Sequence, residues 1–175
     1  MGIKIQWFWA LVILILLVNE MESTKRAEVI EHQLLELMEG IRGKKVGMLT
    51  NPTSVDGSMT LLFDRIIQMA PKYNTTLVCF FAPEHGLRGD RQDGQGDDDY
   101  IDPLTNIQVY SLYGVRKAPT DAQIQQLDAF IYDIQDVGAR YYTFMWTLTY
   151  AIEVCARNNV EVIVFDRPNP IGRKI

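Results

Sequence analysis

Short apolar runs alternate with amphipathic segments along most of this chain. The apolar runs have the length and the β-branched or aromatic content of buried strands, and they cover residues 45–50, 75–82, 107–112, 129–133 and 160–165. The segments before or between them carry apolar residues at three- and four-residue steps, which predicts helices over residues 23–41, 59–69, 119–127 and 141–158. Strands that alternate with helices favour right-handed β-α-β units. The pattern therefore predicts an α/β fold with a mostly parallel sheet covered on both faces.

Two of the predicted helices have a distinct apolar stripe that should face the sheet. In the first helix the stripe consists of Ile30, Leu34, Leu37, Met38 and Ile41. In the last helix it consists of Phe144, Leu148, Ile152 and Cys155. His32 lies opposite the first stripe, so we expect a solvated histidine there.

Residues 1–22 have the pattern of a targeting segment. Lys4 supplies a positive charge, and residues 7–18 form an unbroken apolar run of twelve. Such a run is short for a membrane span, which needs about 20 residues, but it suits a signal peptide. We expect a secreted or periplasmic protein, or a membrane-anchored one if the segment is retained and residues 7–18 act as a tether. Residues 23–175 then form the folded domain.

Composition narrows the classes of function. An apolar fraction of 47% with 22% charged residues is typical of a globular domain. The net charge of −5 and the lack of long basic runs argue against nucleic-acid binding. Cys79 and Cys155 lie in apolar segments, so buried thiols are expected. His32 and His85 are the only histidines, and no cysteine or histidine spacing suits a metal site; no cofactor is expected.

Polar side chains collect where the predicted strands end. They are Asn51 after the first strand, Glu84, His85 and Arg88 after the second, Asp136 and Arg140 after the fourth, and Asp166 and Arg167 after the fifth. In a parallel sheet, ligands bind beyond the carboxyl ends of the strands. The densest group is Glu84, His85 and Arg88, in which an acid, a base and a fixed cation lie within five residues. An ordinary polar loop with a salt bridge explains that stretch equally well.

Several chemistries lack their sequence signature. The first strand is not followed by Gly-x-Gly-x-x-Gly, and neither a P-loop nor a Gly-x-Ser-x-Gly motif occurs. The aspartates of residues 89–103 do not follow the spacing of a calcium-binding loop, so a solvated, mobile acidic loop is expected there. What remains is acid–base chemistry by carboxylates, with Glu84 as the leading candidate, and glycoside cleavage is the common reaction of this kind.

Four segments in register resemble the exo-β-N-acetylmuramidase family, whose NamZ-like members are glycosidases of bacterial cell-wall recycling. The segments are Gly47–Thr53, Phe81–Gly89, Asp133–Thr143 and Asp166–Ile171. The resemblance implies a Rossmann-like three-layer domain that acts on peptidoglycan-derived sugars and releases N-acetylmuramic acid from non-reducing ends. It implies Glu84 as general acid/base with His85 beside it. It also implies a sugar site lined by His85, Arg88, Asp136, Arg140 and Tyr142, in which an arginine would suit the lactyl carboxylate of muramic acid. The polar strand ends add Asn51, Asp166 and Arg167 as candidate substrate contacts.

The resemblance also implies a second, C-terminal domain that closes the cleft, and the family pattern continues beyond the last of these segments. We therefore expect this chain to be the N-terminal domain only, and its activity as it stands is an open question. Two alternatives to a glycosidase follow. The chain could be a non-catalytic module that binds muropeptides or sugars, or an inactive truncated fragment.

Overall fold

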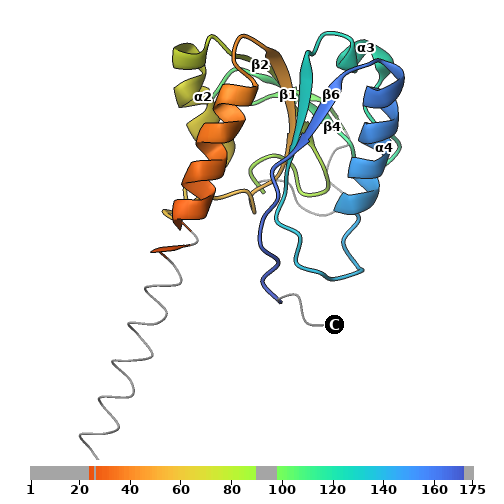
Figure 1. Cartoon of the computed structure of the whole chain (residues 1–175). Helices are drawn as coiled ribbons and strands as arrows, with labels where there is room; N and C mark the ends of the chain where they lie inside the picture. Colours follow the sequence, from red (N-terminus) through yellow and green to blue (C-terminus); the bar gives the residue numbers. More distant parts are fainter. Residues whose placement is uncertain (1–23, 26, 90–97, 172–175) are drawn as a thin grey trace, which may run out of the picture.

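The computed structural model describes residues 24, 25, 27–89 and 98–171, which contain a six-stranded sheet (Figure 1). Its order is β3-β4-β2-β1-β5-β6, and all neighbouring strands are parallel except β3 and β4. The strands are β1 Lys45–Thr50, β2 Thr76–Ala82, β3 Tyr100–Ile101, β4 Gln108–Ser111, β5 Ala129–Asp133 and β6 Glu161–Val164. The predicted α/β fold with a mostly parallel sheet is confirmed, and the order of its five parallel strands is Rossmann-like.

Helices cover both faces of the sheet (Figure 1). The N-terminal helix, residues 27–40, and α2, Leu62–Tyr73, lie on one face, and α3, Asp121–Ile124, and α4, Phe144–Arg157, lie on the other. Alternate residues of a strand point to opposite faces. Met48 of β1 therefore belongs to the apolar core under the N-terminal helix and α2, whereas Leu49 belongs to the core under α3 and α4.

The stripe predicted for the N-terminal helix is confirmed. Leu34, Leu37, Met38 and Ile41 are buried, and Ile30 packs against the same core. His32 is exposed and lies 3.5 Å from the carboxylate of Glu36, one turn further along the helix. The expected solvated histidine is therefore present.

The stripe predicted for the last helix is partly wrong. The helix begins at Phe144, and its buried residues are Thr147, Leu148, Ala151, Val154 and Cys155. Ile152 is 42% exposed because it is one residue, about 100° of helical rotation, away from the buried Ala151. The opposite side of the helix leaves Trp146 64% exposed.

The acidic loop departs from its prediction over residues 98–103. Tyr100 and Ile101 form β3, which pairs antiparallel with β4. Asp102 is fully buried, and Asp99 accepts a hydrogen bond from the Ser111 N–H and pairs with Arg116. The expected solvation is therefore wrong for Asp102, whereas Asp98 and Asp99 are exposed. Asp90, Asp93 and Asp97 lie outside the described residues.

Both cysteines are free and buried, as expected from the sequence. Burial raises the pKa of the Cys79 thiol to about 12 and that of Cys155 to about 11, since a thiolate is poorly stabilised in an apolar core. Neither thiol is therefore available as a nucleophile at neutral pH.

The predicted targeting segment, residues 1–22, lies outside the described residues and stays a prediction. Among the helices that the structure does describe, none has both the length and the apolar character needed to cross a bilayer.

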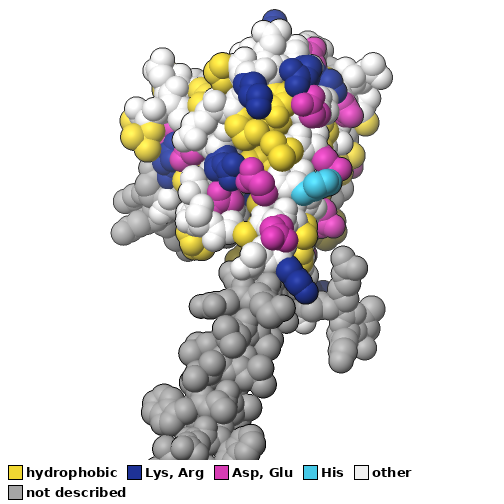
Figure 2. Space-filling view, turned by 60° about the vertical axis from the view of Figure 1, so that its left-hand side comes forward, with side chains coloured by type: hydrophobic (Ala, Val, Ile, Leu, Met, Phe, Trp, Pro, Cys, Tyr) yellow, Lys and Arg dark blue, Asp and Glu magenta, His cyan; other side chains and the backbone are white. Residues whose placement is uncertain are grey.

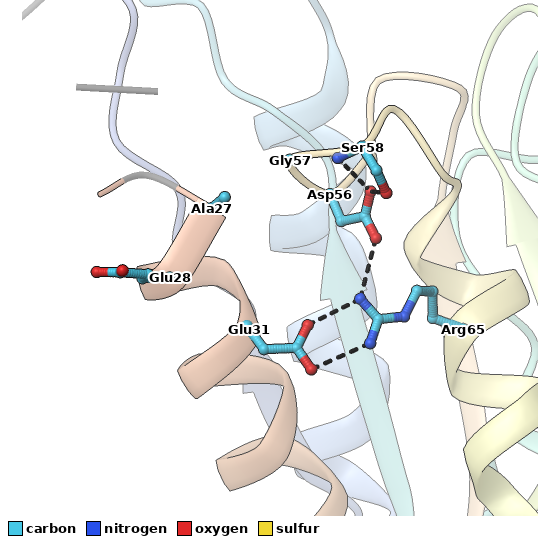
Figure 3. Close-up of a pocket in the computed structure, with 7 residues that line it drawn as sticks. All are labelled: Ala27, Glu28, Glu31, Asp56, Gly57, Ser58 and Arg65. Carbon is cyan, nitrogen blue, oxygen red and sulfur yellow. Dashed lines mark hydrogen bonds and ion pairs between the residues drawn. The ribbon is translucent and has the colours of Figure 1, made fainter. Parts of the chain in front are cut away.

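Charges of both signs are interspersed on the face that carries the N-terminal helix and α2 (Figure 2). On this side Arg65 of α2 reaches between the N-terminal helix and the loop after β1 (Figure 3). Its guanidinium donates to Glu31 at 2.8 and 3.1 Å and to Asp56 at 3.0 Å. The three side chains line a shallow pocket of about 440 Å³, and they tie the first helix to the loop beneath it.

The Asp56 carboxylate should make the stability of the fold depend on pH in the acid range. Burial alone would raise its pKa, but hydrogen bonds from Ser58, Thr60 and Arg65 outweigh burial and lower the pKa from 3.8 to about 2. A depressed pKa stabilises the fold above the unfolded value, and this contribution is lost as the pH falls from about 4 to about 2. Urea unfolding between pH 5 and pH 2 should therefore show a smaller loss of stability for Asp56→Asn than for the wild type. Parallel curves for the two proteins would contradict this.

Candidate active site

The carboxyl edge of the sheet contains a topological switch point between β1 and β5. The chain leaves β1 through α2, on one face, toward β2, and it leaves β5 through α4, on the other face, toward β6 (Figure 1). The chain therefore leaves these two neighbouring strands in opposite directions, and in open α/β sheets this is where ligands bind, beyond the carboxyl ends of the strands. The segments that the sequence singled out follow β1, β2, β5 and β6 at this edge.

The four exit segments contact one another in the order of their strands. A Cβ atom on Gly89 would lie 2.9 Å from Pro52 Cγ, so the exit of β2 packs closely on that of β1. The backbone N–H of Gln135 donates to Thr53 Oγ1 at 3.1 Å, which joins the exits of β1 and β5. Gln135 Nε2 donates to the carbonyl of Pro168 at 3.2 Å, which joins the exits of β5 and β6. The predicted convergence on one edge is confirmed.

Glu84 and His85 lie on a tight turn directly after β2. His85 and Gly86 have φ values of 73° and 78°, in the left-handed region that side chains with a Cβ rarely adopt. The Gly86 N–H donates to the carbonyl of Pro83 at 3.2 Å, and Leu87 is fully buried behind the turn. Glu84 is half-buried and His85 is exposed, and neither side chain bonds to another described residue. The carboxyl group of Glu84 and the imidazole of His85 are therefore not engaged in contacts that stabilise the described fold.

Arg88, which follows this turn, anchors it to neighbouring segments. Its guanidinium donates to Asp102 at 2.8 and 3.0 Å and to Asp64 of α2 at 3.1 and 3.2 Å, and it lies 4.9 Å from the ring centre of Phe63. These hydrogen bonds raise the pKa of Arg88, and the bond from Arg88 is the main cause of the lowered pKa of Asp102. The predicted substrate contact of Arg88 stays a prediction, and the structure shows its guanidinium bonded to two carboxylates.

Replacement of Arg88 by lysine tests this clamp. A single ammonium group does not reproduce paired bonds to two carboxylates, so Arg88→Lys should lose about 2 kcal/mol of unfolding free energy. Amide exchange at Gly86 and Leu87 should accelerate at the same time, because the turn loses its anchor. Urea unfolding and hydrogen exchange measure the two effects. Arg65→Lys, which alters the pair in Figure 3, is the matched control and should leave the exchange of the turn unchanged.

Arg167 is a buried structural residue. Its guanidinium donates to Asp133 at 2.6 and 3.1 Å and to the carbonyl of Val55 at 2.6 Å, and the side chains of Arg167 and Asp133 are 4% and 0% exposed. The Ser54 hydroxyl also donates to Asp133. This network joins the exits of β1, β5 and β6, so Arg167 stabilises the edge of the sheet at which they meet.

The other predicted site residues vary in how far their polar groups are engaged. Asn51 is 3% exposed, and its Oδ1 accepts hydrogen bonds from the N–H and the hydroxyl of Thr53. The Asp136 carboxylate accepts a bond from the Gly138 N–H. Tyr142 is 52% exposed and stacks on Phe144 with ring centres 5.6 Å apart. Asp166 is exposed, as is Arg140, whose guanidinium has no partner within the described ranges.

Sequence reasoning missed the partners that hold the site. Asp64 and Asp102 hold Arg88 of the turn and Ser54 holds Asp133 at the end of β5, but each lies on a segment whose neighbours are set only by the tertiary fold. Within the described part of the chain, no group of three or more His, Cys, Asp or Glu side chains is arranged to hold a metal ion.

The amino-acid sequence matches one protein family and a relative that belongs to it. Residues 46–175 match the family described as "Exo-beta-N-acetylmuramidase NamZ, N-terminal". The chain is 41% identical over 154 residues to the peptidoglycan beta-N-acetylmuramidase NamZ of Bacillus subtilis (strain 168), which covers 86% of the chain and 36% of that protein. The family match contains all four exit segments of the candidate site.

Two crystal structures of DUF1343 family proteins from Bacteroides fragilis NCTC 9343 have a similar fold. The first is 43% identical, with a TM-score of 0.66, and the match covers 83% of this chain and 34% of that one. The second is 29% identical, with a TM-score of 0.56, and the match covers 74% and 31%. The chain thus spans about a third of the length of each of these relatives.

Proposed function

Because this chain belongs to the NamZ N-terminal family, we propose that it carries the catalytic half of an exo-acting β-N-acetylmuramidase. The substrate would be a peptidoglycan fragment with N-acetylmuramic acid at its non-reducing end. The observation that carries the proposal is the turn after β2, which presents Glu84 and His85 at the switch-point edge with neither side chain bonded to the described fold. Family membership supplies the class of substrate.

In this proposal Glu84 acts as the general acid/base. Its carboxyl group donates a proton to the glycosidic oxygen as the bond from that oxygen to the anomeric carbon breaks, and its carboxylate then accepts a proton from the attacking water. His85 lies beside it on the same turn, where an imidazole can hydrogen-bond to the reacting groups. The strained turn and the Arg88 clamp keep the two side chains at the edge.

Binding of the lactyl carboxylate of muramic acid would require a cationic side chain at the same edge of the sheet. The guanidinium groups of Arg88 and Arg167 are already bonded to carboxylates. Arg140 follows β5, is exposed and pairs with no acid in the described ranges, so it is the arginine of the exit segments that remains available for a bidentate contact. We assign it to the substrate carboxylate.

A second candidate function is a sugar-binding module without activity. It is favoured by one observation, namely that the chain spans only about a third of its relatives. Product analysis separates the two. The chain is incubated with a disaccharide that has N-acetylmuramic acid at its non-reducing end, and the release of that sugar is followed by mass spectrometry. Release supports the enzyme, whereas saturable binding without release supports the module.

A further inference from the structure

A second pocket lies one strand away from Glu84, on the side of the sheet that carries α4. It has a volume of about 380 Å³ and is lined by Leu112, Tyr113, Gly114, Lys117, Thr143, Trp146, Thr147 and Tyr150. Its base belongs to the exit of β4, because Leu112 directly follows that strand and donates its N–H to the carbonyl of Ala82 at 2.8 Å. Ala82 is the last residue of β2, two residues before Glu84. The pocket therefore opens at the same edge as the catalytic turn.

The lining of this pocket combines aromatic rings with polar groups. Trp146 and Tyr150 are one helical turn apart on α4 and are 64% and 38% exposed, and Tyr113 faces them from the β4 exit. The three rings gather at one pocket, and exposed apolar groups that gather in this way mark ligand-binding grooves or interaction sites. Lys117 supplies an ammonium group at the rim, and no described acid pairs with it. Thr143 at the start of α4 adds a hydroxyl.

We propose that this pocket binds the neutral N-acetylated pyranose that follows muramic acid in a peptidoglycan fragment. A pyranose has an apolar face of C–H groups that suits a stacked indole or phenol ring, and hydroxyl and acetamido groups around its edge that suit Lys117 and Thr143. Apart from Lys117 the lining side chains are uncharged and largely aromatic, which suits the apolar face and the hydroxyl edge of a pyranose. This inference rests on the proposed function, since the cleaved bond would lie between Glu84 and the pocket.

The tryptophans of the chain make the test direct. The sequence contains Trp7, Trp9 and Trp146 only, so Trp7→Phe and Trp9→Phe in the full chain leave Trp146 as the sole source of tryptophan fluorescence. Titration of that protein with methyl β-N-acetylglucosaminide should give a saturable change in emission. In calorimetry, Trp146→Ala should weaken binding by roughly tenfold or more, whereas Trp146→Phe, which keeps a ring, should retain most of it. Met59→Ala, a truncation at a 77% exposed position away from the pocket, is the matched control.

The outcomes separate this inference from the proposed function. Saturable emission together with loss of binding in Trp146→Ala supports the subsite. Release of N-acetylmuramic acid without any response of Trp146 overturns the subsite and leaves the glycosidase intact. Binding of the sugar that Trp146→Ala leaves unchanged also overturns it, because the sugar then binds elsewhere. A pocket that binds the glucosaminide in a chain that releases no sugar supports the subsite within the binding module.

Discussion

Glu84→Gln is expected to reduce the release of N-acetylmuramic acid by about 10²- to 10⁴-fold, the usual contribution of a general acid/base. Glutamine has nearly the shape of glutamate but has no proton to give to the leaving oxygen. Glu84 is half-buried and unbonded within the described fold, so the substitution breaks no structural contact. The affinity for the sugar, measured by calorimetry, should therefore stay close to that of the wild type, and the loss should appear in kcat.

A matched substitution separates this effect from a general loss of charge. Glu153 is an exposed glutamate of α4, outside the exit segments, and Glu153→Gln should leave the rate unchanged. Circular dichroism of both variants should match the wild type. Full turnover by Glu84→Gln would remove Glu84 from the mechanism.

Arg167→Met is expected to cost about 3–5 kcal/mol of unfolding free energy, the typical result of removing one partner of a buried ion pair. The substitution leaves the fully buried Asp133 carboxylate without its cation and removes the bond to the carbonyl of Val55. Because the network joins three exits of the sheet, the loss should appear as a lower urea midpoint for the whole domain. Urea unfolding followed by circular dichroism measures it.

Two further variants test the physical reason. In Asp133→Asn with Arg167→Met the unpaired charge is gone, so the double variant should recover part of the stability that Arg167→Met loses. Arg157→Met removes the exposed pair with Asp121 on the surface of α3 and α4, where both side chains are more than half exposed. Exposed pairs contribute little, so the midpoint should hardly move. An equal effect of Arg157→Met and Arg167→Met would contradict the role of burial.

The central strands could be predicted because their sequence pattern is local. The runs at residues 45–50 and 129–133 became β1 and β5 with the same bounds, since a mostly apolar run between polar turns fits a strand buried on both faces. The two-residue strand β3 has no such pattern. It exists because Tyr100 and Ile101 lie against β4, which only the tertiary fold determines.

The site could be predicted in position but not in detail. The rule that ligands bind at the carboxyl ends of parallel strands placed Glu84, Asp136 and Arg167 at one edge. It does not say which polar side chains the fold itself uses. Arg88 and Arg140 both lie in polar segments that follow a strand, so the rule treats them alike. In the structure Arg88 is bonded to Asp64 of α2 and to Asp102 of the segment after β3, whereas Arg140 has no partner within the described residues. The aromatic pocket was missed for the same reason, because Tyr113 and Trp146 meet only in the folded chain.

Hydrolysis of a chromogenic aryl β-N-acetylmuramide, with the matching aryl β-N-acetylglucosaminide as control, decides whether this chain is a muramidase. We expect the muramide to be cleaved and the glucosaminide to be cleaved much more slowly. Arg140→Met should reduce this preference for the muramide, because the lactyl carboxylate loses its partner. Equal cleavage of the two substrates would contradict the assignment to muramic acid. Saturable binding of the muramide without any cleavage would contradict the catalytic role of Glu84 in this chain.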